Sequence, residues 1–453
     1  MENKSRKQQR SRLERDSVQQ SPGSLEINLG WAFSPWTLLL SLPIPLFLIS
    51  IIQPASSYLL WGQPYWITQE YVVLAAATIF ILGFIFSINA RVNRSSTKIL
   101  FSNDLVRKLR RAKNAIALLV SISYFIWIVS GLTKGLNVSI LLDALNGSNG
   151  AIWKLKTDIL APISGVTTWV ALATILGPLA IILWRITGES QKVLLITLLG
   201  VTALRATFFS ERLAIVELGI ACIFAYASTA RQVPLPLRTV KNYVLTLSIA
   251  FTLYVGFFSA TELIRSWVYY SNKTQISIVQ FSFERIIAYY ATALNNGALY
   301  ININKYSWSP FDLIQGTFDT TLASNSIAFL GASGLEKFSA ALFYRSNPEF
   351  NNVSGLLITN SSLGIVGSWI FWIVIGSLAC LVFNKASSGS LIAFLAYPIF
   401  AIGIIEIVRL FYFGQTRIIP NLIALFVLST YLGRMSVELN PANPSQKDIR
   451  EKK

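Results

Sequence analysis

Residues 364–383 read GIVGSWIFWIVIGSLACLVF, a run without a single charged side chain. A helix of about 20 apolar residues is long enough to cross the hydrocarbon core of a bilayer. Similar blocks of 16–21 residues recur along the chain of 453 residues, in which 53% of the residues are hydrophobic and only 13% are charged. A soluble domain carries about 25% charged residues, so this composition excludes an ordinary soluble protein.

The apolar blocks predict an all-α polytopic membrane protein with ten transmembrane helices. The predicted spans are about 35–52, 71–88, 115–132, 164–184, 193–209, 213–228, 243–260, 364–383, 391–411 and 418–433. One large non-membrane loop, 261–363, separates the seventh span from the eighth. The chain is thus expected to consist of a disordered basic tail at 1–34, helices one to seven in 35–260, the loop, helices eight to ten in 364–433, and a polar tail at 434–453.

The distribution of lysine and arginine predicts the orientation of these helices. The two tails and the loops on their side carry 25 Lys and Arg residues, whereas the opposite side carries 11. Cytoplasmic loops are enriched in these residues, so both termini are expected in the cytoplasm and loop 261–363 outside. The net charge of +17 lies in short stretches between apolar blocks, and we therefore expect a lipid bilayer and no nucleic acid as partner.

Several kinds of chemistry are excluded or disfavoured by the residues that the chain lacks. It contains no histidine and no Asp-x-Asp sequence, and its first outer loop, 53–70, has Glu70 as its single acidic residue. A histidine base and histidine-ligated metals are thereby excluded, and no metal site or cofactor is predicted. Cys222 and Cys380 lie inside apolar blocks, which favours packing over disulfide bonding.

A few ionisable residues within the spans require an explanation. They are Arg205, Glu217, Glu406 and Arg409. Each costs roughly 2.5–3.5 kcal/mol at the centre of a membrane helix. One explanation is internal pairing, because Glu406 and Arg409 are three residues apart and share a helix face.

A second explanation is an anion site. Arg212 and Arg417 lie at the outer ends of the helical hairpins 193–228 and 391–433. If the helices continued through these ends, Arg205 would share a face with Arg212, and Arg409 with Arg417. A guanidinium fork matches phosphate oxygens, so these four arginines predict a pocket for a lipid pyrophosphate.

Loop 261–363 is too long for a plain connector. It contains the potential amphipathic helices 284–300 and 334–346, together with many tryptophan and tyrosine residues. Such rings form the aromatic belt of membrane proteins, or they provide a surface on which sugars stack; both interpretations remain open at this point.

Some segments resemble the bacterial O-antigen or oligosaccharide repeat-unit polymerases, which are integral membrane enzymes. They are ALRATFFSERLAIVELGI at 203–220, FERIIAYYATALNNGALY at 283–300, RSNPEFNNVSGLLITNSSLGIVGSWIFWIVIG at 345–376 and EIVRLFYFGQTR at 406–417. As architecture, the resemblance covers most of the chain. The related O-antigen ligases commonly have a histidine in the large outer loop, and its absence here favours a polymerase.

The resemblance implies transfer of a growing glycan from its polyprenyl-pyrophosphate carrier, such as undecaprenyl pyrophosphate, to the next lipid-linked repeat unit. It further implies a bacterial inner membrane, a periplasmic loop 261–363, and a chain-length regulator and a flippase as partners in exopolysaccharide synthesis. We expect a metal-independent glycosyltransferase in which a carboxylate takes the acceptor proton. The expected site residues are Arg205, Arg212, Arg409 and Arg417 for pyrophosphate, Glu211 and Glu284 as catalytic carboxylates, and Tyr289, Tyr290, Asn295, Asn296 and Arg345 for the glycan.

Three other functions remain open from the sequence, and a fourth is disfavoured. The fourth is a glycosyltransferase that uses polyprenyl-phosphate sugars, because such enzymes usually have paired carboxylates and a metal in the first outer loop, where this chain has only Glu70. A transporter or lipid-linked sugar flippase would use the intramembrane charges, although it would not need loop 261–363. A ligase-like glycosyltransferase would share the architecture. A structural scaffold in an export complex would need no catalytic residue.

Overall fold

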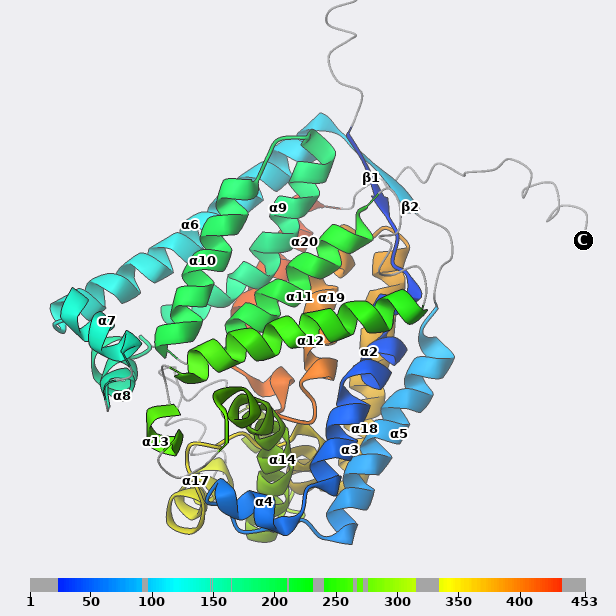
Figure 1. The fold of residues 1–453 in the computed structure, drawn as a ribbon. Helices are drawn as coiled ribbons and strands as arrows, with labels where there is room; N and C mark the ends of the chain where they lie inside the picture. The colour runs from blue at the N-terminus through cyan, green and yellow to red at the C-terminus, as the bar shows by residue number, and fades with distance from the viewer. Residues whose placement is uncertain are drawn as a thin grey trace, which may run out of the picture.

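The computed structural model describes residues 23–91, 97–146, 148, 150–163, 165–209, 212–230, 240–263, 267–271, 276–314 and 334–433. It is mostly helical (78%) and contains one two-stranded ribbon (Figure 1). The elements of the first half are β1 Gly23–Ile27, α2 Pro35–Ser41, α3 Pro43–Ile52, α4 Ala55–Leu60, α5 Gln69–Asn89, β2 Thr97–Phe101, α6 Asn103–Thr133, α7 Val138–Leu145, α8 Ala151–Lys154, a π-helical turn Leu155–Ile159, a 3-10 helix Thr167–Leu172 and α9 Ala173–Thr187.

The second half carries the elements that surround the site. They are α10 Lys192–Phe209, α11 Leu213–Ser228, α12 Val240–Glu262, α13 Val268–Ser271, α14 Ile278–Asn304, α17 Gly334–Arg345, α18 Gly355–Ser387, α19 Leu391–Ile405, a 3-10 turn Tyr412–Gly414 and α20 Ile418–Leu432. Several helices begin at a serine whose hydroxyl accepts a hydrogen bond from a backbone N–H of the first turn. Ser34, Ser102, Ser277 and Ser390 cap α2, α6, α14 and α19 in this way.

Among the described residues, five helical segments are long and apolar enough to cross a membrane, and shorter apolar helices accompany them. The five are Pro35–Ile52, Gln69–Asn89, Asn103–Thr133, Thr167–Thr187 and Gly355–Ser387. The shorter ones are Leu213–Ser228, Leu391–Ile405 and Ile418–Leu432. Every predicted span overlaps one of the helices, so the prediction of an all-α, multi-pass membrane protein agrees with the structure.

The ribbon corrects the prediction of a disordered tail at 1–34. Within the described part of that tail, β1 pairs antiparallel with β2, with Leu25 opposite Ile99. Both residues are buried. The strand was not predicted because five residues, GSLEI, are too few to show a clear strand pattern, and their partner strand comes some 70 residues later. Residues 1–22 and 434–453 lie outside the described residues.

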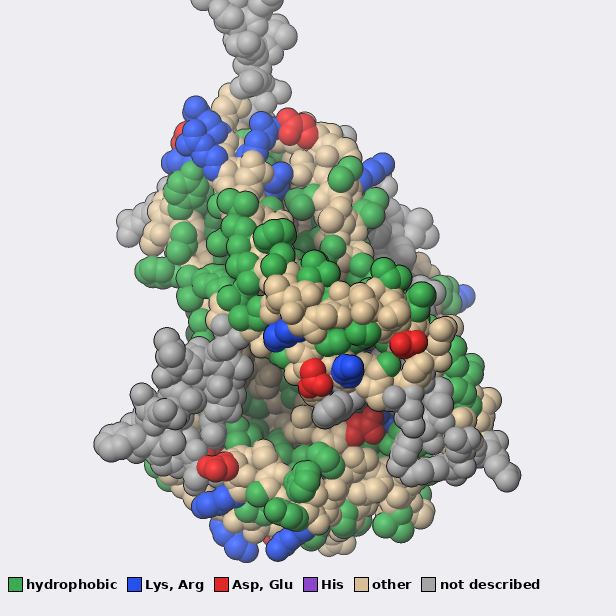
Figure 2. All heavy atoms as spheres, turned by 90° about the vertical axis from the view of Figure 1, so that its left-hand side faces the viewer, with side chains coloured by type: hydrophobic (Ala, Val, Ile, Leu, Met, Phe, Trp, Pro, Cys, Tyr) green, Lys and Arg blue, Asp and Glu red, His purple; other side chains and the backbone are tan. Residues whose placement is uncertain are grey.

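The ribbon marks one end of the helical bundle, which we call the ribbon end. Here the Thr97 hydroxyl donates to the Ser387 carbonyl over 2.8 Å, and Arg110 forms an ion pair of 2.6 Å with Glu189. The segments that follow α5, α9 and α18 therefore meet at this end. Figure 2 shows Lys and Arg side chains gathered there, whereas α4, α13, α14 and α17 lie at the opposite end (Figure 1).

Helix α18 begins at Gly355, earlier than the predicted 364, and is interrupted where that prediction placed its start. Gly364 has φ 69° and ψ 169°, a conformation essentially restricted to glycine. Residues 359–362 before this kink, TNSS, are polar and were predicted to lie in the loop, yet Thr359, Asn360 and Ser361 are fully buried. A short buried helix thus precedes the apolar one.

The two helices expected within loop 261–363 are both present, as α14 and α17. Helix α17 presents one apolar face, whereas α14 is buried along most of its second half. It packs against α3, α12 and α18. This central position allows α14 to contribute to the cavity described next.

Candidate functional site

A cavity of about 220 Å³ opens among the loops opposite the ribbon end. We call it the cationic cavity, because Lys156, Arg212, Arg409 and Arg417 line it. Tyr289 and Tyr290 of α14 and Glu349 of the α17–α18 loop also line it, together with the amides Asn351, Asn352 and Gln415. Figure 2 looks onto a hollowed face of the molecule, with basic and acidic side chains around the hollow.

Three of the four predicted arginines thus line one cavity, but helix continuity does not bring them there. Helix α10 ends at Phe209 and Arg212 is the N-cap of α11. Helix α19 ends at Ile405, so Arg409 lies in the turn that follows, and Arg417 is the N-cap of α20. Arg212 therefore belongs to the start of α11 and Arg417 to the start of α20, so the assumption that each pair lies on one continuous helix is wrong.

The fourth arginine, Arg205, lies in a neighbouring cavity of about 190 Å³. This cavity is also lined by Glu217 and by the threonines Thr167, Thr168, Thr174, Thr202 and Thr416. The guanidinium of Arg205 lies 5.8 Å from the ring centroid of Trp127. Arg417 and Gln415 line both cavities, so Arg417 forms part of the wall between them.

Two of the arginines that line the cationic cavity, Arg409 and Arg417, form ion pairs with buried carboxylates. Arg409 Nε lies 2.7 Å from Glu406 Oε2, which confirms the predicted pair. Arg417 Nη1 lies 3.0 Å from Glu217 Oε2, and the Tyr412 hydroxyl donates to the same carboxylate over 2.8 Å. Each carboxylate offsets the cost of removing an arginine from water, which for an unpaired buried charge is several kcal/mol or more.

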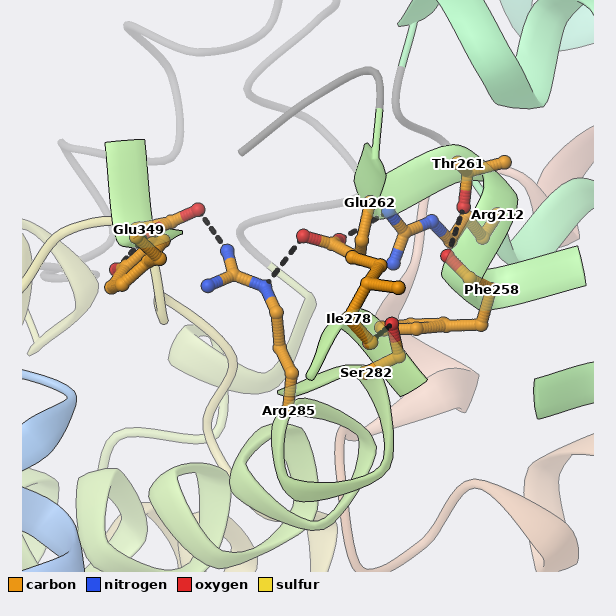
Figure 3. Close-up of polar contacts among 9 residues, drawn as sticks. Arg212, Phe258, Thr261, Glu262, Ile278, Ser282, Arg285 and Glu349 are labelled. Atoms are coloured by element: carbon orange, nitrogen blue, oxygen red, sulfur yellow. Dashed lines mark hydrogen bonds and ion pairs between the residues drawn. The ribbon is translucent and has the colours of Figure 1, made fainter. Parts of the chain in front are cut away.

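A relay of alternating charges connects two walls of the cavity (Figure 3). Glu262, at the end of α12, is fully buried and accepts from Arg212 with Oε1. Its other oxygen lies 2.9 Å from Arg285 Nε of α14. Arg285 in turn donates through Nη2 to Glu349 Oε1. Arg212 and Glu349, which both line the cavity, are therefore linked through two buried side chains.

Aromatic rings surround the Arg285 guanidinium, whose carbon lies 5.1–5.7 Å from five ring centroids. The rings are those of Trp61, Tyr270, Phe281, Tyr289 and Phe350. A cation within about 6 Å of a ring centroid is attracted by the ring. Burial alone would lower the pKa of Arg285, but Glu262, Tyr289 and Glu349 outweigh it and raise the pKa above the ordinary value.

Glu349 is fixed through both its side chain and its backbone. The Tyr270 hydroxyl donates to Oε2 over 3.0 Å, and Asn347 Oδ1 accepts from the Glu349 N–H over 3.0 Å. Burial, followed by the adjacent Glu349 carboxylate, raises the pKa of Tyr270 to about 12, although Arg285 opposes this rise. Tyr270 therefore remains a neutral hydrogen-bond donor at physiological pH.

The asparagines predicted to bind glycan are fully buried and hold loops instead. Asn296 Nδ2 donates to the carbonyls of Phe350 and Asn352, over 2.6 and 2.9 Å. Asn295 Oδ1 accepts from the Trp66 N–H over 2.7 Å. Asn296 thus anchors the backbone next to Glu349, and neither amide lines the cationic cavity.

The remaining predicted site residues lie elsewhere. Glu284 accepts from Gln280 over 2.9 Å and faces another cavity, with Tyr58 and Trp61. Arg345, at the end of α17, is exposed and lines a fourth cavity, with Trp66 and Tyr344. Glu211 lies outside the described residues.

Four residues of this site were not among those predicted from the sequence: Lys156, Glu262, Arg285 and Glu349. One signal was present for Arg285: it lies four residues after Phe281 and four before Tyr289. Residues four apart on a helix are neighbours on one face, so this spacing surrounds the charge with aromatic rings.

No group of three or more potential ligands that could hold a metal ion is found among the described residues. Comparisons of the chain with protein families, characterised proteins and solved structures find no match.

Proposed function

We propose that this chain is an integral membrane glycan polymerase. In this reaction the growing glycan moves from its polyprenyl-pyrophosphate carrier to a hydroxyl of the next lipid-linked repeat unit, and polyprenyl pyrophosphate leaves. The observation that carries the proposal is the cationic cavity, in which four basic side chains and one carboxylate, Glu349, share a wall at one end of the helical bundle.

The chemistry of the reaction suits this arrangement. Pyrophosphate is a good leaving group, so the principal demand is positive charge where the departing oxygen becomes negative. Arg212, Arg409 and Arg417 supply guanidinium groups whose positions are set by buried carboxylates. Donors that are already in place need no reorganisation during the reaction, and their charge requires no metal ion.

Two cavities that meet at Arg417 further support a polymerase. Donor and acceptor both carry a lipid pyrophosphate, so the enzyme must hold two anionic headgroups at once. We assign the leaving pyrophosphate to the cationic cavity. The acceptor headgroup is assigned to the neighbouring cavity, where Arg205 lies among threonine hydroxyls.

The proposal includes ten membrane crossings, cytoplasmic termini and a bacterial inner membrane. The orientation is supported by the excess of Lys and Arg on the predicted cytoplasmic side, which carries 25 of these residues against 11 on the opposite side. The meeting of the segments after α5, α9 and α18 at the ribbon end also agrees with it. The cationic cavity would then open toward the periplasm, at the depth of lipid headgroups.

The decisive experiment is deletion of the gene in its native host, followed by analysis of lipid-linked oligosaccharides by mass spectrometry and of polysaccharide length by gel electrophoresis. We expect long polysaccharide to disappear and single lipid-linked repeat units to accumulate in the outer leaflet. Complementation with the wild-type gene should restore both. Accumulation in the inner leaflet would indicate a flippase, and long glycan retained on its lipid carrier would indicate a ligase.

A further inference from the structure

Glu349 is distinguished from the other carboxylates near the cationic cavity by its exposure. Its side chain is 27% exposed, whereas those of Glu217, Glu262 and Glu406 are 3%, 0% and 4% exposed. It is the one acidic residue among those that line the cavity in the described part of the chain. A carboxylate that only neutralises an arginine has no need to reach the cavity.

The pairing of Arg285 supports the same distinction. Arg285 is fully buried, and Glu262, also fully buried, lies 2.9 Å from its Nε. Its charge therefore has a partner without Glu349. Binding a second, partly exposed carboxylate through Nη2 does not improve neutrality, but it does fix the direction of Glu349.

Three further contacts restrict Glu349. Tyr270 donates to its second oxygen, Asn347 accepts from its N–H, and Asn296 anchors the following carbonyl of Phe350. A side chain held at both oxygens, beside a cavity lined with cations, has the geometry of a preorganised reacting group.

We propose that Glu349 is the general base of the transfer reaction and that Arg285 is the positioning residue that holds it. This inference rests on the function proposed above. The Glu349 carboxylate takes the proton of the acceptor hydroxyl as that oxygen forms its bond to the anomeric carbon of the donor. The bond from this carbon to the pyrophosphate oxygen breaks, and its electron pair leaves with the lipid pyrophosphate beside Arg212 and its neighbours. Protonated Glu349 then returns its proton to water.

The buried ion pairs also connect the proposed base, Glu349, to Arg212 in the leaving-group site. Arg285 contacts Glu262, and Glu262 contacts Arg212, so the base and one cation of the leaving-group site are held by the same buried pair. Displacing Arg285 should disturb both, whereas replacing Glu349 by its amide should affect only proton transfer.

The test uses the full chain in proteoliposomes, with the lipid-linked oligosaccharide that accumulates in the deletion strain as substrate. Glu349→Gln is expected to slow transfer by about 10²–10⁴-fold, the range for loss of a general base. Its affinity for farnesyl pyrophosphate, used as a binding probe, should stay within threefold of wild type. Glu336→Gln, which changes an exposed carboxylate on α17, is the matched control and should behave as wild type.

The outcomes are distinguishable. Transfer by Glu349→Gln within threefold of wild type would overturn the assignment of the base while leaving the polymerase proposal intact. No transfer by the wild-type protein would contradict the polymerase itself. If Glu349→Gln does not fold, Tyr270→Phe serves instead: it removes one hydrogen bond to Glu349 and should lower kcat several-fold with KM unchanged, and an unchanged kcat would again overturn the proposal.

Discussion

Replacing Glu262 by glutamine should be among the most destabilising single changes in this protein. Its carboxylate is fully buried and is shared by Arg212 and Arg285. Two unit charges about 4 Å apart attract each other by about 4 kcal/mol at an effective dielectric constant of about 20. Glutamine removes this attraction toward both arginines and leaves their desolvation cost in place. Since breaking a buried pair from one side typically costs about 3–5 kcal/mol, we expect the free energy of unfolding of Glu262→Gln to fall by that amount.

A double-mutant cycle with Arg285→Met tests whether the loss arises from the pair. Methionine occupies similar space without charge, so the second substitution removes one of the charges that the first leaves uncompensated. We expect the double variant to be about 2–3 kcal/mol more stable than the sum of the two single effects predicts, at the upper end of measured coupling between contacting residues. Glu336→Gln, at an exposed position, should change the free energy of unfolding by less than about 0.5 kcal/mol.

The assay is unfolding by SDS titration in mixed detergent micelles, followed by tryptophan fluorescence. A loss below about 1 kcal/mol for Glu262→Gln, or additivity of the two changes within about 0.5 kcal/mol, would refute the reasoning. Either result would mean that solvent or a rearranged side chain replaces the missing charge.

Further predictions concern the cavity, the topology and the kink. Arg212→Lys and Arg417→Lys should insert normally yet lose most long-chain product, because lysine lacks the fork that binds two phosphate oxygens. Near wild-type polymer in both would limit these arginines to structural ion pairs with Glu262 and Glu217. Transfer by the purified protein should persist in excess EDTA, and loss of activity that magnesium restores would contradict metal independence. A cysteine at Ser271 should react with an impermeant thiol reagent in intact cells and one at Ser445 only after permeabilisation, so labelling of both in intact cells would be incompatible with the proposed topology. Gly364→Ala should lower the free energy of unfolding by about 1–3 kcal/mol, the cost of a strained backbone conformation, because φ is 69°. An added Cβ would meet no atom within 4 Å, so a steric clash would not contribute to this loss. Unchanged stability would show that the chain relaxes there without cost.

The helices could be predicted because the membrane imposes a local rule. Backbone groups in lipid must be satisfied within the segment, so an uninterrupted apolar block such as 364–383 is sufficient to predict a helix. The ion pair between Glu406 and Arg409 could also be predicted, because it depends only on a local spacing of three residues. Where the chain is polar but buried, as at Thr359, the local rule fails, and α18 extends beyond its predicted start.

The site could be predicted only in part because its contacts are long-range. Two arginines that were predicted at helix ends, Arg212 and Arg417, do line one cavity. Arg409 was predicted within a span and lines the same cavity because α19 ends before it, at Ile405. Which carboxylate supports each arginine was not predictable: Arg417 pairs with Glu217 from 200 positions away, and Arg285 binds Glu349 across 64 positions. The sequence around Glu349, SNPEFNN, has no periodicity that would have placed it in a cavity.

The balance of charges around the cavity changes how an anion site in this protein should be understood. The basic side chains at or beside it are Lys156, Arg212, Arg285, Arg409 and Arg417, and the acidic ones are Glu217, Glu262, Glu349 and Glu406. Among the described residues, these five cations and four carboxylates leave a net charge of only +1, so a strong positive field is not what would attract a pyrophosphate. The three arginines that line the cavity, Arg212, Arg409 and Arg417, are each paired with a buried carboxylate, which preorganises their donors. Binding should therefore depend on the geometry of the guanidinium groups more than on total charge, and this is why substitution by lysine, which preserves charge and removes the fork, tests the site more sharply than a neutral replacement.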